Sequence, residues 1–190
     1  MNLFSDNINE FQSTYTKTSG SVLKKNSKKK AIFLNRLNSL EKILPEIKSG
    51  YDYHLISCEN LGSIELLYTL IKKYNFTEIK ICTWSYNASF VELIKENTNK
   101  IKFTIIVDMS MQTRKHALFN QLKEIHNENK ITFKQHKGIH AKVTICKSEK
   151  LNLSVEASAN YSNNVRVEQF NISANNELYN FHNKWIGKFV

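Results

Sequence analysis

The sequence has little cysteine and almost no proline. Its three cysteines, Cys58, Cys82 and Cys146, are widely spaced, odd in number and without a C-x-x-C pair. This pattern argues against a disulfide framework and against a zinc site, so we expect neither a metal nor a cofactor. A single proline in 190 residues, 41% of them hydrophobic, indicates a chain that is folded over most of its length.

Long hydrophobic runs are also absent. No apolar stretch approaches the roughly 18 residues that a membrane span needs. The first residues, MNLFSDNINEF, carry acidic side chains and lack the apolar core of a signal peptide. We therefore expect a soluble, cytoplasmic protein without a membrane partner.

Positive charge is in excess: 27 basic residues face 17 acidic ones, which gives a formal net charge of +10. Such a surplus favours polyanionic partners, namely nucleic acid, anionic membranes or acidic proteins. However, 24 of the basic residues are Lys, only three are Arg, and Asn occurs 23 times. An AT-rich genome would encode this usage by bias alone, so charge leaves both interpretations open.

The chain divides once, near residue 30. Residues 1–30 are polar and close on the run KKNSKKK, which predicts a flexible basic arm that either stays solvated or touches a phosphate backbone. Residues 31–190 suit one α/β domain, since no repeat or linker divides them. Over residues 31–44, apolar residues at close to helical spacing before Pro45 predict a helix.

From Tyr51 onward, strand-like alternation and helical stripes follow each other. Strands are expected over 51–58, 78–85, 102–110, 131–138, 139–148 and 151–160. Helices are expected over 63–74, around 90–94, over 118–125 and over 178–189, the last with Phe181, Trp185 and Phe189 in the core. This order predicts a mixed, mostly parallel sheet flanked by helices on both faces.

The residues with the richest chemistry lie in the last third of the chain. Residues two apart in a strand share a face, so His140 and Lys142 form one pair, and Ser158 and Asn160 form another on the next strand. If these strands are neighbours, the four side chains converge, and Glu168 lies close enough to fold back behind them. Such a set suits phosphodiester chemistry, because an imidazole can attack phosphorus while Lys and Asn hold its oxygens and a carboxylate fixes the ring.

The segments His140–Lys142 (H-A-K), Ser158–Asn160 (S-A-N) and Glu168–Gln169 (E-Q) resemble the H-x-K, S-x-N and E-Q signature of the phospholipase D superfamily. The resemblance is greatest to small prokaryotic members with one motif per chain and extends over most of residues 50–190. It implies that His140, Lys142 and Glu168 are catalytic. His140 would form a phosphohistidine, Glu168 would orient a histidine, and Lys142, Ser158 and Asn160 would bind the phosphate.

In this family two H-x-K motifs meet across a pseudo-twofold axis. Because this chain has one full motif, with H-x-K followed by S-x-N and E-Q, the resemblance implies a homodimer with a composite site, in which the second histidine protonates the leaving group. The basic charge, and the lack of an amphipathic segment for membrane docking, favour nucleic acid over lipid as the substrate. The expected function is therefore a metal-independent nuclease that acts on DNA.

The sequence departs from the family pattern in three places. Lys147 stands where the family commonly has Asp, Ala157 stands where it has Gly, and the gap between Lys142 and Ser158 is longer than usual. These departures keep two alternatives open: a nucleic-acid-binding protein that has lost turnover, and a structural protein of a mobile element. Fold resemblance alone does not decide between them.

Five further residues have two interpretations each. His136 shares strand parity with the motif histidine and either extends the site or has no role in it. Lys137 and Arg166 either contact a phosphate chain or are solvated. Trp84 and Tyr86 follow the second expected strand, where they offer a base-stacking platform or pack at the core and its rim.

Overall fold

A computed structural model describes residues 22–25, 29–34, 40–41, 44–57, 61–162 and 166–190. Its strands are β1 (Val22–Lys25), β2 (Lys29–Leu34), β3 (Asp52–Ser57), β4 (Glu78–Thr83), β5 (Lys102–Asp108), β6 (Ile131–His136), β7 (Val143–Lys147), β8 (Asn152–Ala157) and β9 (Glu168–Ser173). Its helices are α3 (Ser63–Lys73), α4 (Ala88–Asn97), α5 (Met111–Arg114), α6 (His116–Asn127), α7 (Asn176–Ile186) and the 3-10 turn η1 (Gly187–Phe189).

The described strands form one mixed sheet in the order β1-β2-β3-β9-β8-β7-β4-β5-β6. Pairs β2–β3, β4–β5 and β5–β6 are parallel, and the other neighbours are antiparallel. It follows that six strands run one way and β1, β7 and β9 run the other way. Strands β4, β5, β6 and β8 therefore end, and β7 and β9 begin, at the same edge, which we call the C-terminal edge.

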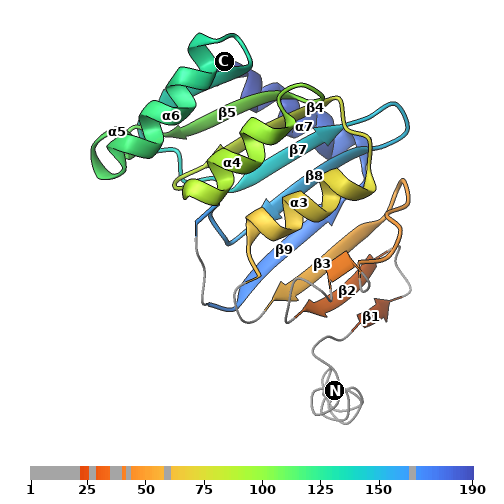
Figure 1. Ribbon diagram of the computed structural model, residues 1–190. Coiled ribbons are helices and arrows are strands. Elements are labelled where there is room, and N and C mark those ends of the chain that lie inside the picture. Colours follow the sequence, from red (N-terminus) through yellow and green to blue (C-terminus); the bar gives the residue numbers. More distant parts are fainter. Residues whose placement is uncertain (1–21, 26–28, 35–39, 42–43, 58–60, 163–165) are drawn as a thin grey trace.

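Helices cover both faces of the sheet, which confirms the expected α/β class (Figure 1). Helices α3, α4 and α6 lie on one face over the larger core, whose fully buried side chains include Phe90, Phe103 and Phe170. Helix α7 lies on the other face, where Ile186 packs in a smaller core with side chains such as Ile106. Strand β5 feeds both cores, which explains its nearly continuous apolar run.

The N-terminal part of the domain differs from the one expected. Residues 1–21, 26–28 and 35–39 lie outside the described residues, so most of the expected arm stays a prediction. Residues 22–25 and 29–34, however, form β1 and β2, and β2 pairs in parallel with β3. The expected helix is therefore wrong over 31–34. A short apolar run such as AIFL fits a strand or a helix equally well, and pairing with β3 decides for the strand.

The expected core position is wrong for Phe181 of α7 but not for Trp185 and Phe189, which are half-buried and pack against the smaller core. Phe181 is 62% exposed, whereas His182 is 4% exposed and Ile186 is fully buried. The Trp185 indole N–H donates to His182 Nδ1 at 2.8 Å, and His182 Nε2 lies 3.0 Å from Glu156 Oε1. These partners satisfy the ring nitrogens of His182, so the polar histidine occupies the inner face and Phe181 turns outward.

Strand β9 was not expected, because only Phe170 and Ile172 mark its alternation. It lies between β3 and β8 and completes the sheet around the C-terminal edge. None of the described helices has the length and apolar character that crossing a bilayer requires.

Candidate active site

His140 and Lys142 lie just before β7 and not within it, in contrast to the expected strand. The pairing of β4 with β7 reaches only as far as Cys82 and Val143. Beyond that point Ser85 O accepts a hydrogen bond from Tyr161 N at 3.1 Å, so the β4 side offers no ladder to the segment 139–142. The motif residues therefore lie on an extended turn at the C-terminal edge.

This turn begins at Gly138, which has a φ of 84°. Such a left-handed conformation favours glycine, which has no Cβ to clash. Gly138 N donates to Asp108 Oδ2 at 2.9 Å, and Lys142 O accepts from Ala157 N at 2.9 Å. The turn that carries His140 is thus attached to β5 at its start and to β8 at its end.

The His140 and Lys142 side chains meet, as the expected pairing requires. Lys142 Nζ lies 3.1 Å from His140 Nδ1 and donates to His140 O at 2.7 Å. His140 is exposed and Lys142 is half-buried. Burial lowers the pKa of the Lys142 ammonium, and the charge of Glu168 acts against this shift. The imidazole and the ammonium therefore lie next to each other at the open C-terminal edge of the sheet.

Ser158 and Glu168 form the second part of the site. The Ser158 hydroxyl donates a very short hydrogen bond to Glu168 Oε2 and accepts one from Gln169 N at 2.9 Å. Glu168 is 7% exposed and begins β9, whose register brings it beside the end of β8. The carboxylate is thus held within electrostatic reach of Lys142.

Asn160 approaches the site from the loop after β8. Thr83 Oγ1, at the end of β4, lies 3.3 Å from Asn160 Oδ1 and 3.0 Å from Ser85 O. The loop is also held at the next residue, because Tyr161 O accepts from Asn87 N at 2.8 Å. The structure therefore gathers all five residues of the motif at the C-terminal edge of the sheet.

Of the two aromatic residues after β4, only Trp84 borders the site. Its ring centroid lies 5.8 Å from that of His140, and the Arg114 guanidinium carbon lies 4.0 Å from the centre of the indole. Tyr86 is fully buried and packs against Phe90 with ring centroids 5.5 Å apart, so the base-stacking interpretation is wrong for Tyr86.

The other flanking residues lie near the site without joining it. The His136 ring packs edge-on against Phe189, with centroids 4.7 Å apart, so its described ring contact is to η1 and not to the motif. Lys137 and Arg166 are exposed at the same edge, and their contact with a phosphate chain stays a prediction.

Sequence reasoning missed three residues that shape the site: Thr83, Asp108 and Arg114. Asp108 had a readable signal, because it is the first polar residue after the apolar run of β5. Ser110 N donates to its Oδ1 at 2.9 Å, and the hydrogen bonds from Ser110 and Gly138 lower its pKa. Arg114 carried no signal beyond the scarcity of arginine.

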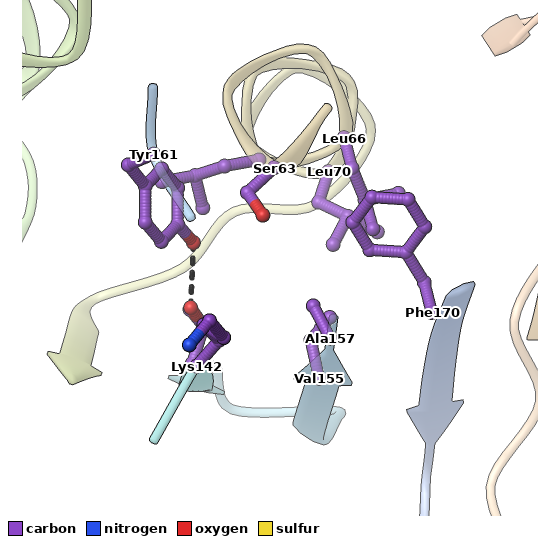
Figure 2. A pocket seen from close by; sticks show the side chains of 10 residues that line it. Ser63, Leu66, Leu70, Lys142, Val155, Ala157, Tyr161 and Phe170 are labelled. Atoms are coloured by element: carbon purple, nitrogen blue, oxygen red, sulfur yellow. Dashed lines mark hydrogen bonds between the residues drawn. The ribbon is translucent and has the colours of Figure 1, made fainter. Parts of the chain in front are cut away.

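A small cavity lies beneath Lys142, between α3 and strands β7 to β9 (Figure 2). Leu66 and Leu70 reach from α3 toward Val155 of β8 and Phe170 of β9. Its volume of about 10 Å³ holds no more than about one water molecule. A substrate would therefore bind on the open edge above it. Among the described residues, no three His, Cys, Asp or Glu side chains lie together as possible metal ligands.

No protein-family model matches the sequence, and no curated protein matches it. Solved structures do match the fold. NucT from Helicobacter pylori has a TM-score of 0.53 and 16% identity, over 73% of this chain and 95% of NucT. TrmBL2, an archaeal chromatin protein with a novel mode of DNA binding, has a TM-score of 0.53 and 13% identity, over 80% of this chain and 57% of TrmBL2.

A polyphosphate kinase from Porphyromonas gingivalis also has a TM-score of 0.53, with 11% identity. The match covers 70% of this chain but only 25% of the kinase. At these identities the likeness is one of fold, and the chain spans little more than half of TrmBL2 and a quarter of the kinase. The comparisons therefore show the fold alone, and that fold is phospholipase D-like.

Proposed function

We propose that this protein is a metal-independent phosphodiesterase that cleaves DNA through a phosphohistidine intermediate. The observation that carries the proposal is the grouping of His140, Lys142, Ser158, Asn160 and Glu168 at one edge of this fold. Each side chain has the chemistry that one step of phosphodiester cleavage requires.

In the first step, an imidazole nitrogen of His140 attacks phosphorus, and the bond from phosphorus to the leaving oxygen breaks. The leaving oxygen takes a proton from the imidazolium of a second copy's His140. In the second step, water attacks the phosphohistidine, the N–P bond breaks, and the second imidazole accepts the proton of the water. The steps consume one water and need no oxidant, reductant or cofactor.

Lys142 and Asn160 would hold the non-bridging oxygens, where negative charge builds up in the transition state. The half-buried position of Lys142 strengthens that interaction, because less water screens it than would screen a fully exposed ammonium. Ser158 would keep the Glu168 carboxylate in place. The carboxylate in turn would stabilise a histidine while it carries positive charge.

A second H-x-K tripeptide, at residues 182–184, lies on α7, where His182 is buried and bonded to Glu156 and Trp185. The chain therefore supplies one histidine to the C-terminal edge, and the proposal requires a homodimer. His140 is exposed at the C-terminal edge, which leaves it open to a second copy across a twofold axis. Sedimentation of the purified protein should therefore give the mass of a dimer at micromolar concentration. A monomeric mass under the assay conditions would contradict a composite site.

Lys147, which stands where the family commonly has Asp, does not weaken the proposal. It ends β7, where it pairs with Glu78 and Asn152, and His140 lies before the opposite end of that strand. The substitution therefore changes a position remote from the motif residues. It gives no reason to expect a loss of turnover.

A binding protein without turnover is the second candidate. The observation that favours it is the likeness to TrmBL2, which is described as a DNA-binding chromatin protein. The motif residues and the net charge of +10 would then serve only to hold a phosphate backbone. Under this alternative the protein binds DNA in a salt-dependent way and leaves it intact.

Cleavage in the presence of EDTA separates the two candidates. Labelled single- and double-stranded DNA and RNA would be incubated with the wild type, with His140→Asn and with His126→Gln. His126 is the matched control, because it contacts Ile131 O at the start of β6, at the edge opposite the site. We expect cleavage by the wild type and by His126→Gln but not by His140→Asn. Intact substrate in every lane between about pH 5 and 8, the usual range of histidine titration, would refute the enzyme.

A further inference from the structure

The side chain of Arg114 lies on the wall of the site and has no part in the steps above. We propose that Arg114, stacked on Trp84, forms a second phosphate subsite that holds a neighbouring phosphate of a single nucleic-acid strand. This inference rests on the proposed function, because it assigns the same site a chain of phosphates and not a small phosphodiester.

The fold holds Arg114 in a fixed relation to His140. The Asp108 carboxylate accepts hydrogen bonds from Ser110 N, just before α5, and from Gly138 N, in the turn before His140, each at 2.9 Å. The short helix that carries Arg114 and the turn that carries the histidine are thus tied to one side chain. Their relative position depends on Asp108 and not on flexible loops alone.

Trp84 provides the second link. The indole centroid lies 4.0 Å from the Arg114 guanidinium carbon and 5.8 Å from the His140 ring centroid. The guanidinium can therefore be no farther from the imidazole centre than the sum of these two distances. Stacking on an indole orients a guanidinium while it leaves the N–H groups at its rim available.

The Arg114 guanidinium retains donors for an anion. It carries five N–H groups in a planar fork. The described contacts use two of them, because Nε donates to Ser110 Oγ at 3.0 Å and Nη2 lies 3.8 Å from Met111 Sδ. The side chain is exposed, and no carboxylate forms an ion pair with it within the described part of the chain. The remaining N–H groups of this planar fork match the oxygens of a phosphate.

A second cation lies next to Arg114. Lys115 Nζ donates to Tyr86 O at 2.6 Å. Burial lowers the pKa of the Lys115 ammonium, and the positive charge of Arg114 lowers it further. Two like charges held side by side repel each other, and a bound anion relieves that repulsion. The two cations therefore favour an anion at this position, and the Asp108 carboxylate, whose pKa Arg114 lowers, offsets part of that effect.

A larger hollow in the described part of the chain does not suit a polyanion. A groove of about 500 Å³ runs between α3 and α4 and is lined by Glu65, Glu92 and Glu96. These carboxylates repel phosphates. A strand that leaves His140 would therefore run over Trp84 and α5 rather than across this groove.

Binding measured against salt concentration tests the subsite without cleavage. In a His140→Asn background, fluorescence anisotropy with a labelled single-stranded DNA oligonucleotide gives log K at several salt concentrations. Loss of one phosphate contact in Arg114→Ala should reduce the slope against log salt by about 0.7, whereas Arg114→Lys should retain most of it. Lys150→Ala is the matched control, because exposed Lys150 lies in the β7–β8 turn at the opposite edge. An unchanged slope in a folded Arg114→Ala protein would overturn the inference.

A kinetic comparison separates this inference from the proposed function. With His140 intact, Arg114→Ala should lower the ratio of oligonucleotide cleavage to bis(p-nitrophenyl) phosphate hydrolysis about tenfold, the effect of losing one charged hydrogen bond. An equal loss on both substrates would overturn the subsite, because Arg114 would then act through His140. A wild type that cleaves neither substrate would refute the enzyme, while a changed salt slope would still support the subsite.

Discussion

Replacing Asp108 with asparagine tests whether one carboxylate holds together the two segments that carry the site. Asp108 is 8% exposed and accepts hydrogen bonds from Ser110 N, from the Ser110 hydroxyl and from Gly138 N. Asparagine has almost the same shape, but its amide nitrogen would bring N–H groups against one of these donors. The substitution therefore removes a charge and at least one hydrogen bond without leaving a cavity.

The expected loss follows from those hydrogen bonds. A hydrogen bond to a charged group contributes about 1.5–3 kcal/mol, so Asp108→Asn should lower the free energy of unfolding in urea at about pH 7 by about 2 kcal/mol. A displaced turn would also move His140, and a shift of about 1 Å can lower the rate about a hundredfold. Urea unfolding and steady-state cleavage measure the two effects separately.

The stabilisation that the Asp108 carboxylate provides should depend on pH. Hydrogen bonds, the Ser110 hydroxyl first among them, hold the pKa of Asp108 below its ordinary value. The carboxylate therefore stabilises the fold fully above the ordinary aspartate pKa of about 3.9, and this stabilisation is lost as the pH falls through the lower pKa of the folded protein. The gap between wild type and Asp108→Asn should thus shrink at acid pH.

Glu128→Gln is the matched control, because Glu128 is an exposed carboxylate that pairs with Lys130 at 2.7 Å. It should not change the unfolding free energy measurably at neutral pH. Equal stability of Asp108→Asn and the wild type at neutral pH would show that the hydrogen bonds to Asp108 do not stabilise the fold. A difference in unfolding free energy that stays constant through acid pH would show that the Asp108 charge does not contribute.

Two further substitutions test the site and the fold. Lys142→Gln should lower kcat for oligonucleotide cleavage about a hundredfold with a smaller change in KM, because the ammonium acts mainly on transition-state charge; an effect on KM alone would contradict that role. On α7, Ile186→Ala should lower the free energy of unfolding by about 2–5 kcal/mol, whereas Phe181→Ala should leave it nearly unchanged. A larger loss of unfolding free energy in Phe181→Ala than in Ile186→Ala would mean that Phe181, and not Ile186, packs in the core.

Much of the fold could be predicted because its pattern is local. Helix α3 and strands β3 to β6 each bury one clear stripe or run, and their expected positions agree with the structure. The proximity of the motif residues could also be predicted, since β7 and β8 are neighbours joined by a short turn. Adjacent strands with polar side chains at one end place those side chains together whatever surrounds them.

The remaining parts of the fold depend on tertiary contacts that leave no pattern in the local sequence. Strand β2 forms because β3 offers it a partner, and β9 because it fits between β3 and β8. On α7, His182 lies inward because Glu156 and Trp185 satisfy its ring nitrogens. Arg114 reaches the site only through the return of the chain from β5, a consequence of sheet order rather than of any motif.

Capture of the covalent intermediate is the direct test of the phosphohistidine mechanism. The wild type would be mixed with a single-stranded oligonucleotide in EDTA and quenched in alkali, and tryptic peptides prepared at alkaline pH would be analysed by mass spectrometry, with His140→Asn and His126→Gln beside it. We expect a phosphoryl adduct on His140 in the wild type and in His126→Gln, and none in His140→Asn. Cleavage without an adduct on His140, or cleavage that requires a metal ion, would contradict this mechanism.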